Sequence, residues 1–447
     1  MVIFSIIYKR KGDYMSWWNN YEDEFIEMVA YYESILKRSE ELEKFFSDYK
    51  KETMYRLVFE SNTIENEGLK INETKKLSLG IDYELNNNLK DIFNNFRNEA
   101  KLSYQSNDGF LSLINNSVSE LTEHSENFEN YANLIFQEVE KYLSKKMLEH
   151  FKNEKLVFLK DNLSGKININ YQDSMKEFQI TFNQIFLLTV NNSFTDLILL
   201  LVKNIKEFLK RIDINLLDYL LKEHVFKGED IDIKDVKSFI ENLTKLSDEN
   251  LRGVACSFLS SGEYLKMLHE LVANKLDNND NGNPGEYRNE AAFIDLDTTF
   301  LQPNLIESAM KNLANSSFDR ALHENYNFIL EACKNSALFI KIHPFGDFNG
   351  RISRLLLNNF YIMNKLPFFI VLRSDSKDKK KYIESMRRYY ESKKIDKFLS
   401  LICKTFKKHI DEINDSLDLA GLDIIEKTEL SEEKINQLKK SLKFYGL

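Results

Sequence analysis

Residues able to perform acid–base and phosphate chemistry gather in one short segment, HPFGDFNGRISR, which runs from His343 to Arg354. A histidine is the side chain best suited to take a proton near neutral pH, and an aspartate can hold a hard cation that bridges phosphates. Two arginines three positions apart on a helical turn repel each other unless an anion lies between them. The segment therefore offers a candidate base, His343, a candidate metal ligand, Asp347, and an arginine pair, Arg351 and Arg354, that suits a polyphosphate.

The segment is predicted to be a loop between two buried helices, because apolar residues at helical spacing both precede and follow it. Pro344 disfavours continuation of the first helix, and the second is expected to begin near Asn349. The first turn of a helix exposes unpaired N–H groups and a partial positive charge. The backbone from Phe348 to Arg351 is therefore a natural cradle for phosphate oxygens, and Gly350 permits their close approach.

This segment resembles the signature of the Fic family, H-P-F-x-D/E-G-N-G-R-x-x-R. The matching positions are His343, Pro344, Phe345, Asp347, Asn349, Gly350, Arg351 and Arg354. The resemblance implies Mg²⁺-dependent transfer of AMP from ATP to a Tyr, Thr or Ser hydroxyl of a protein, either a target protein or the chain itself.

The resemblance also assigns roles to these residues. His343 is expected to take the proton from the acceptor hydroxyl, and Asp347 to hold Mg²⁺ between the α- and β-phosphates. The phosphate-binding residues are expected to be Phe348, Asn349, Gly350, Arg351 and Arg354, with the last of these on the γ-phosphate.

One departure from the family pattern leaves the activity open. Phe348 stands where the family has a small residue, usually glycine. If the position requires a positive φ, the phenyl side chain imposes strain of about 1–3 kcal/mol. The alternatives are a relative that moves another phosphate-containing group, one that removes AMP, and a catalytically silent module that binds nucleotide or protein.

A second resemblance lies near the N-terminus, in SNTIEN from Ser61 to Asn66. It is similar to the inhibitory motif S/T-x-x-x-E-G/N of one Fic class, in which the glutamate competes with the γ-phosphate for the second motif arginine. Here the resemblance pairs Glu65 with Arg354. The alternative interpretation is an ordinary helix end capped by Ser61.

Three further segments are similar to parts of the family core. Residues 285–303 resemble the flap hairpin, in which Phe293 and Ile294 are the candidates for holding an extended stretch of the target. The helix expected over residues 265–276 resembles the one before the flap, and its His269 is interpreted as structural. Tyr382 is a candidate contact to the adenine.

Composition narrows the class of protein. The 447 residues carry a formal net charge of −9, which argues against nucleic acid as the main partner. Three distant cysteines favour a reducing compartment and argue against zinc. No apolar run is long enough to cross a membrane, so a cytoplasmic protein without a membrane partner is expected. A calcium loop at 277–288 is disfavoured because Arg288 replaces its last glutamate ligand.

The predicted fold is all-α, because the chain has only 4 prolines and 14 glycines. We expect a Fic-type helical core with a short β-hairpin flap and an inserted, mostly helical domain. The predicted domains are an N-terminal helical region at 1–104 with the inhibitory motif, an inserted domain at 105–245, the catalytic core at 246–410 and a helical tail at 411–447. Alternation over 155–182 predicts a small β-meander in the insert. The sequence leaves open whether translation starts at Met1 or at Met15. It also leaves open the target protein, the nucleotide preference and the oligomeric state.

Overall fold

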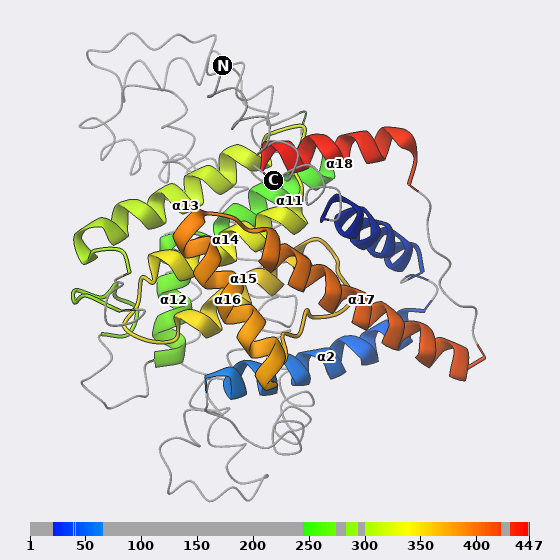
Figure 1. Cartoon of the computed structure of the whole chain (residues 1–447), viewed down its shortest axis with the longest axis horizontal. Coiled ribbons are helices and arrows are strands. Elements are labelled where there is room, and N and C mark those ends of the chain that lie inside the picture. Colours follow the sequence, from blue (N-terminus) through cyan, green and yellow to red (C-terminus); the bar gives the residue numbers. More distant parts are fainter. Residues whose placement is uncertain are drawn as a thin grey trace, which may run out of the picture. The chain divides into compact units, whose positions relative to one another are not determined.

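The computed structural model describes residues 21–38, 40, 42–65, 245, 247–273, 283–293, 300–421, 430–445 and 447. Every regular element in these ranges is helical, as predicted from the scarcity of proline and glycine (Figure 1). The predicted inserted domain with its β-meander lies outside the described residues, apart from residue 245. Met15 and residues 277–282, the first half of the candidate calcium loop, lie outside them too. Among the described helices, none has the length and apolar character needed to cross a membrane.

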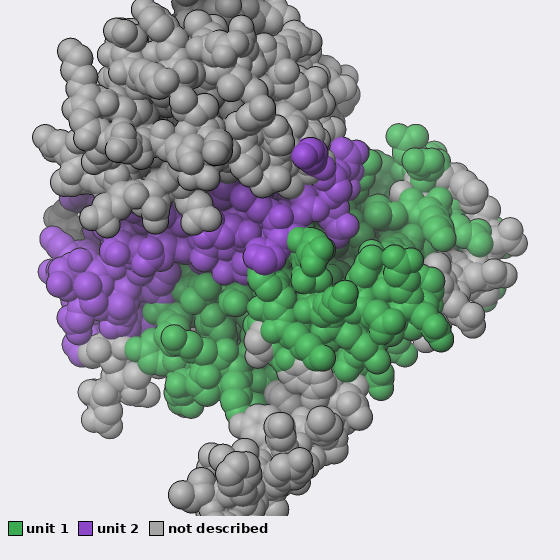
Figure 2. Space-filling model, turned by 90° about the horizontal axis from the view of Figure 1, so that it is seen from above, with its two compact units in different colours: residues 1–71, 324–341, 353–447 green, residues 72–323, 342–352 purple. Residues whose placement is uncertain are grey.

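The chain divides into two compact units, which Figure 2 shows in different colours. The first unit consists of residues 1–71, 324–341 and 353–447, and the second of residues 72–323 and 342–352. The boundaries fall at the two ends of the motif segment, so that the loop itself belongs to the second unit.

The first unit is a set of helices around an aromatic and aliphatic core. They are a helix at residues 21–38, α2 (Glu43–Ile64), most of α14 (Phe328–Ile342), α15 (Asn349–Met363) from residue 353 onward, α16 (Ser376–Ser392), α17 (Asp396–Leu419) and α18 (Glu432–Phe444). The helix α17 illustrates why these sequences are helical, since its buried residues recur every three or four positions. Buried members of this stripe are Phe398, Ile402, Phe406, Ile410, Ile413 and Leu417.

The helices α14 and α15, which flank the motif segment, approach closely through small residues. The hydroxyl oxygens of Ser336 and Ser353 lie 2.8 Å apart, and each also lies within hydrogen-bond distance of the other residue's carbonyl oxygen, so their two protons are shared among these three contacts. The Ser353 hydroxyl is thus satisfied although the residue is fully buried. This contact fixes α15 immediately after the motif loop.

The second unit contains α11 (Asp248–Leu259), α12 (Gly262–Ala273), the short 3₁₀ helix η2 (Pro303–Leu305) and α13 (Ile306–Ala321). The helix α11 packs against α13, and Asn250 ties them by donating to the carbonyl oxygens of Ala321 at 2.7 Å and His323 at 3.1 Å. The helix expected over 265–276 is present as α12, which begins three residues earlier. The chain that leaves α13 at residues 321–323 is therefore anchored on packed helices.

The predicted flap is described only at its base. Phe300 donates its N–H to the carbonyl oxygen of Ala292 at 2.9 Å, so the two arms of the segment are joined there. Phe293 is 62% exposed, and Ile294 lies outside the described residues. The hairpin itself therefore stays a prediction.

Candidate active site

The motif segment forms a tight loop between α14, which ends at Ile342, and α15, which begins at Asn349. Asn349 closes this loop from within. Its side-chain oxygen accepts from the Phe345 N–H at 3.1 Å, and its side-chain nitrogen donates to the Phe345 carbonyl oxygen at 2.8 Å. The asparagine is 1% exposed, so the side chain works here as a clamp on the loop backbone, and the helix begins at the residue expected from the sequence.

His343 lies at the start of the loop, half-buried and with φ 52°. Its imidazole stacks on the ring of Phe300, with 3.9 Å between the ring centroids and 10° between the planes. The stack holds the ring plane in one orientation. A base that must reach a substrate hydroxyl benefits from such a fixed orientation.

Arg288 is a residue whose role the sequence analysis missed. Its guanidinium donates to three carbonyl oxygens, those of His343 at 2.7 Å, Glu290 at 2.7 Å and Leu301 at 2.5 Å. Its own N–H donates to the Pro344 carbonyl oxygen at 2.9 Å. The side chain, 7% exposed, therefore fastens both arms of the flap base to the motif loop. The only signal in the sequence was an arginine at the entry to the flap segment.

His269 supports the loop from α12. It is 1% exposed, stacks on Phe345 with 4.1 Å between centroids, and its Nδ1 accepts from the Gly285 N–H at 2.9 Å. Burial lowers the pKa of His269 to about 4, so the ring is neutral at pH 7. This environment is that of a structural histidine. Gly285 itself has φ +79°, a backbone angle that favours glycine.

Phe348, the departure from the family pattern, has φ 61° and is 4% exposed. A bulky side chain is uncommon in this left-handed region, so the loop carries strain at this position. The ring lies 4.9 Å from the Arg351 guanidinium and meets the His269 ring edge-on at 6.0 Å. The phenyl group is therefore packed beside the first motif arginine, in a cation–π contact.

Asp347 is half-buried, and its Oδ1 accepts from the Phe348 N–H at 2.6 Å. The residues that the structure describes contain no group of three side chains able to hold a metal ion by themselves. Mg²⁺ is commonly held by one or two carboxylates with substrate phosphates supplying further ligands. A single carboxylate at this place fits that pattern.

The N-terminal turn of α15 follows directly. Ile352 donates to the Phe348 carbonyl oxygen at 3.0 Å, so the N–H groups of Asn349, Gly350 and Arg351 precede the first bond of the helix ladder. Arg351, 2% exposed, lies in this same turn. The partial positive charge of the helix start and the guanidinium thus both favour an anion.

Arg354 lies in the first unit, where it contacts the end of α2. Its Nη2 donates to Glu65 Oε1 at 2.6 Å and to the Ser61 carbonyl oxygen at 3.0 Å, and its Nε donates to Ser61 Oγ at 2.8 Å. Ser61 is in the last turn of α2, where its hydroxyl accepts from the arginine; it does not cap a helix start. The guanidinium also lies over the ring of Tyr382 at 5.9 Å.

The structure thus brings the predicted residues together in two groups, one in each unit. In the second unit the motif loop and the first turn of α15 join His343, Asp347, Phe348, Asn349, Gly350 and Arg351. In the first unit Arg354 meets Ser61, Glu65 and Tyr382. Tyr382 is 6% exposed, and burial raises the pKa of its phenol. Asn66 lies outside the described residues.

Comparisons with known proteins agree on one family. The model of the Fic/DOC family matches residues 259–361. A Fido domain-containing protein of Dictyostelium discoideum is 33% identical over 130 residues, which cover 26% of this chain and 82% of that protein.

Two solved structures are also similar at lower identity. A Fic domain containing signaling protein from Bacteroides thetaiotaomicron is 16% identical, with a TM-score of 0.30, and covers 57% of this chain and 100% of its own. Fic-1 from C. elegans is 14% identical, with a TM-score of 0.28, and covers 62% of this chain and 98% of its own.

Proposed function

The chain belongs to the Fic/DOC family, and on that premise we propose that it transfers AMP from ATP to a Tyr, Thr or Ser hydroxyl of a protein. Members of this family are typically transferases. The observation that carries the proposal is the order of groups along the motif loop. The loop carries the imidazole of His343, whose orientation is fixed by its stack on Phe300, and the carboxylate of Asp347. The helix α15 begins two residues after Asp347, at Asn349.

The proposed reaction is a nucleophilic displacement at the α-phosphorus of ATP. His343 takes the proton from the acceptor hydroxyl as its oxygen bonds to the α-phosphorus, and the bond from that phosphorus to the bridging oxygen breaks. Pyrophosphate leaves with the electron pair of that bond. The N–H groups of Asn349 and Gly350 and the Arg351 guanidinium stabilise the negative charge on the phosphate oxygens.

Asp347 is the residue that would hold Mg²⁺. When bound, this ion would offset the negative charge of the α- and β-phosphates. The single half-buried carboxylate supports this assignment, because the phosphates themselves supply the remaining charged ligands.

We also propose that the protein without substitutions, called the parent below, is autoinhibited. Arg354 would bind the γ-phosphate, and a carboxylate held on this guanidinium competes with a terminal phosphate for the same donors. The 2.6 Å contact of Glu65 with Arg354 supports this competition. Nucleotide would still bind, but with its triphosphate displaced from the reactive position.

The acceptor protein would dock on the flap. Its extended backbone would add to the flap as a strand, with Phe293 and Ile294 as the contacts that hold it, and Tyr382 would contact the adenine. The exposure of Phe293, whose side chain is large and apolar, supports this use of the flap.

The experiment compares ATP radiolabelled at the α-phosphate with ATP labelled at the γ-phosphate, each with Mg²⁺ and a cell lysate. It is run on the parent, on Glu65→Gly and on Glu65→Gly with His343→Ala. Protein labelled only from the α position, and only while His343 is present, supports AMP transfer. Label from the γ position, or ATP binding without any labelling in Glu65→Gly, contradicts it and favours another transferred group or the silent module that Phe348 suggests.

A further inference from the structure

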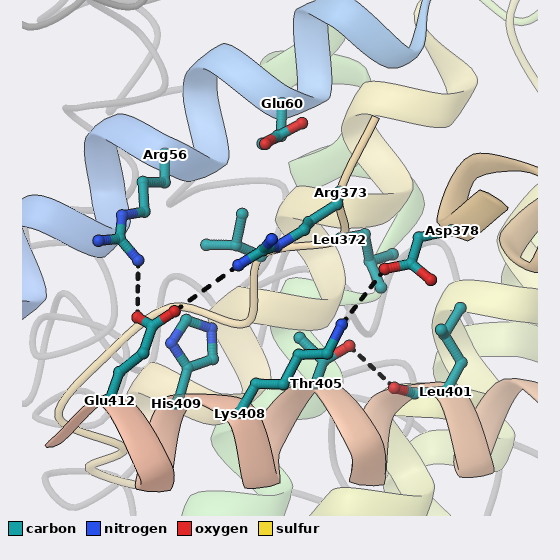
Figure 3. Close-up of a pocket in the computed structure, with 11 residues that line it drawn as sticks. Arg56, Glu60, Leu372, Arg373, Asp378, Leu401, Thr405, Lys408, His409 and Glu412 are labelled. Carbon is teal, nitrogen blue, oxygen red and sulfur yellow. Dashed lines mark hydrogen bonds and ion pairs between the residues drawn. The ribbon is translucent and has the colours of Figure 1, made fainter. Parts of the chain in front are cut away.

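A cavity of about 270 Å³ lies within the first unit, among α2, the segment at 371–373, α16 and α17 (Figure 3). Its size is close to the roughly 300 Å³ at which small-molecule sites begin. Its charged lining consists of Arg56, Glu60, Arg373, Asp378, Lys408 and Glu412. None of the residues assigned above to catalysis, nucleotide binding or inhibition lines it.

The carboxylates of α16 and α17 in this cavity are already engaged by donors. Glu412 accepts from Arg56 at 2.7 Å and from the Tyr49 hydroxyl at 3.1 Å. Burial alone would raise the pKa of Glu412, but the hydrogen bond and charge of Arg56 hold it below the ordinary value. Asp378 pairs with Lys381 at 3.0 Å and with Lys408 at 3.4 Å. Burial alone would raise the pKa of Asp378, but these two lysines hold it below the ordinary value, so its charge too is balanced within the protein.

Two half-exposed cations of the lining make only one contact each with these carboxylates. Arg373 is 52% exposed, and its Nη2 lies 3.7 Å from Glu412 Oε1. Lys408 is 54% exposed and donates one hydrogen bond, to Asp378 Oδ2 at 3.4 Å. Figure 3 shows both side chains extending toward the space between α2 and α17. A guanidinium has five N–H donors and an ammonium three, so most of these donors are not used by the contacts within the cavity.

His409 adds no positive charge to the lining. The residue is 4% exposed, and burial lowers its pKa to about 4. Its ring is therefore neutral at pH 7, and its Nδ1 is hydrogen-bonded with the Tyr49 hydroxyl at 2.9 Å. The hydrogen-bond donors left unused in the lining therefore belong mainly to Arg373 and Lys408. They suit a ligand with several hydrogen-bond acceptors.

We propose that this cavity binds a small metabolite through an oxyanion group, a carboxylate or a phosphate, held between Arg373 and Lys408, and that the bound ligand keeps α2 docked. Arginine binds either group in a bidentate manner, and lysine adds a point charge. The regulatory half of the proposal rests on the autoinhibition proposed above, whereas the binding half does not.

The coupling follows from the position of α2 in the wall of the cavity. Arg56 and Glu60 of this helix line the cavity, and Ser61 and Glu65 at its end contact Arg354. Glu60 also accepts from the Ser374 N–H at 2.6 Å, which ties α2 to the segment beside Arg373. If α2 leaves, the cavity loses one wall, so the ligand binds the docked arrangement better. By linkage, the ligand stabilises that arrangement and reduces transfer.

The binding test titrates the full chain with malonate and, separately, with inorganic phosphate, using calorimetry. The variants are Arg373→Gln, Arg373→Gln with Lys408→Gln, and a control, Lys404→Gln. The control removes a cation of α17 that pairs with Glu24 and does not line the cavity. We expect binding to the parent and the control, and at least about tenfold weaker binding to the double variant, because charge-assisted hydrogen bonds are lost.

Binding of malonate alone supports a carboxylate ligand, binding of phosphate alone supports a phosphate ligand, and binding of both supports a general oxyanion site. The binding proposal is overturned if neither anion binds the parent, or if the double variant binds as the parent does. Both substituted side chains are half-exposed, and Arg373→Gln alone provides a readout if the double variant does not fold.

Hydrogen exchange tests the coupling without any transfer assay. The bound anion should slow amide exchange along α2 in the parent and in Lys404→Gln but not in the double variant. It should also slow transfer by the parent while leaving transfer by Glu65→Gly unchanged. Unchanged exchange in α2 on binding overturns the coupling, whereas absence of transfer in Glu65→Gly, with exchange slowed as expected, counts against the proposed function instead.

Discussion

Arg354 and Glu65, 289 positions apart in the sequence, form an ion pair with 2.6 Å between Nη2 and Oε1. The arginine side chain is 2% exposed and the glutamate side chain 35% exposed. Two further donations, to the hydroxyl and carbonyl oxygens of Ser61, fix the guanidinium against the last turn of α2. The guanidinium that we propose for the γ-phosphate is therefore engaged by the protein's own helix α2.

Glu65→Gly is expected to raise the transfer rate by about tenfold or more, because a charge-assisted hydrogen bond contributes about 1.5–3 kcal/mol. The change removes the competing carboxylate and leaves every proposed catalytic group in place. The measurement is the rate of protein labelling with ATP labelled at the α-phosphate. ATP affinity should change much less than this rate, since the carboxylate diverts bound nucleotide more than it excludes it.

The gain should depend on Arg354. Adding Arg354→Ala to Glu65→Gly is expected to cancel most of the increase, because the two residues act on each other. A matched control is Asp48→Gly, which removes an exposed carboxylate from the N-terminal half of α2. Equal rates for Glu65→Gly and the parent would leave the ion pair as a purely structural contact.

His343→Ala is expected to abolish transfer while ATP binding persists, because the imidazole is assigned to the acceptor hydroxyl and not to the phosphates. The measurement pairs the labelling rate with a nucleotide titration, both in the Glu65→Gly background. Its fold control is the midpoint of thermal unfolding, since the substitution also removes the stack on Phe300. Transfer within a few-fold of the parental rate would remove the assignment of His343 as the base.

Phe348→Gly is expected to lower the transfer rate and the stability. Glycine relieves strain of about 1–3 kcal/mol at φ 61°, but removal of a buried aromatic side chain costs about 3–5 kcal/mol. The ring also packs on Arg351, so its loss frees the guanidinium that is assigned to the phosphates. A rate higher than that of the parent would mean that the phenyl group obstructs the phosphates.

Phe348→Leu is the control that separates packing from the ring's electrostatics. Leucine fills part of the same buried space but has no π-system to attract the guanidinium. We expect the unfolding midpoint of this variant to lie between those of the parent and Phe348→Gly. Its transfer rate should fall nearly as far as that of the glycine variant if the cation–π contact positions Arg351.

Much of the local structure around the motif could be predicted from the sequence, because it depends on near neighbours. The stop of one helix before Pro344 and the start of the next at Asn349 follow from local backbone rules. The pairing of Glu65 with Arg354 followed from a resemblance, and the structure contains this contact, although its effect on activity stays a prediction.

The role of Arg288 could not be predicted in this way. Its acceptors are backbone carbonyl oxygens of His343, Glu290 and Leu301, which any residue type would supply. No pattern of side chains therefore marks them. The charged cavity beside α2 was missed for a related reason, because its lining comes from four separate segments of the chain.

Arg288→Lys is expected to destabilise the second unit by roughly 3 kcal/mol, because an ammonium cannot reach three divergent carbonyl oxygens and each buried one left unpaired costs about 1–3 kcal/mol. The transfer rate should also fall, since the flap base and His343 share this anchor. Chemical denaturation followed by helical circular dichroism measures the first effect. Arg252→Lys, on α11, is the matched control, and an equal effect of the two substitutions would argue against the anchoring role.

The stability of the fold is expected to fall with pH below neutrality. Burial lowers the pKa of His269 to about 4, whereas an unfolded histidine titrates at about 6.5. Between these two values the unfolded chain binds a proton here that the folded chain does not. The free energy of unfolding therefore falls by about 1.4 kcal/mol for each pH unit from about 6.5 down to about 4, with no further loss from this group below that. His409 shifts in the same direction for the same reason and adds a second such contribution.

His269→Asn tests this contribution, because its side-chain oxygen can accept from the Gly285 N–H in place of Nδ1 and does not titrate. The variant loses the stack on Phe345, so it should be less stable than the parent at pH 7. As the pH falls to 5, the parent loses stability through His269 and the variant does not, so the difference between their unfolding midpoints should narrow. A difference that stays constant from pH 7 to pH 5 would show that His269 takes up its proton without unfolding, and that the loop beside Phe345 tolerates an imidazolium.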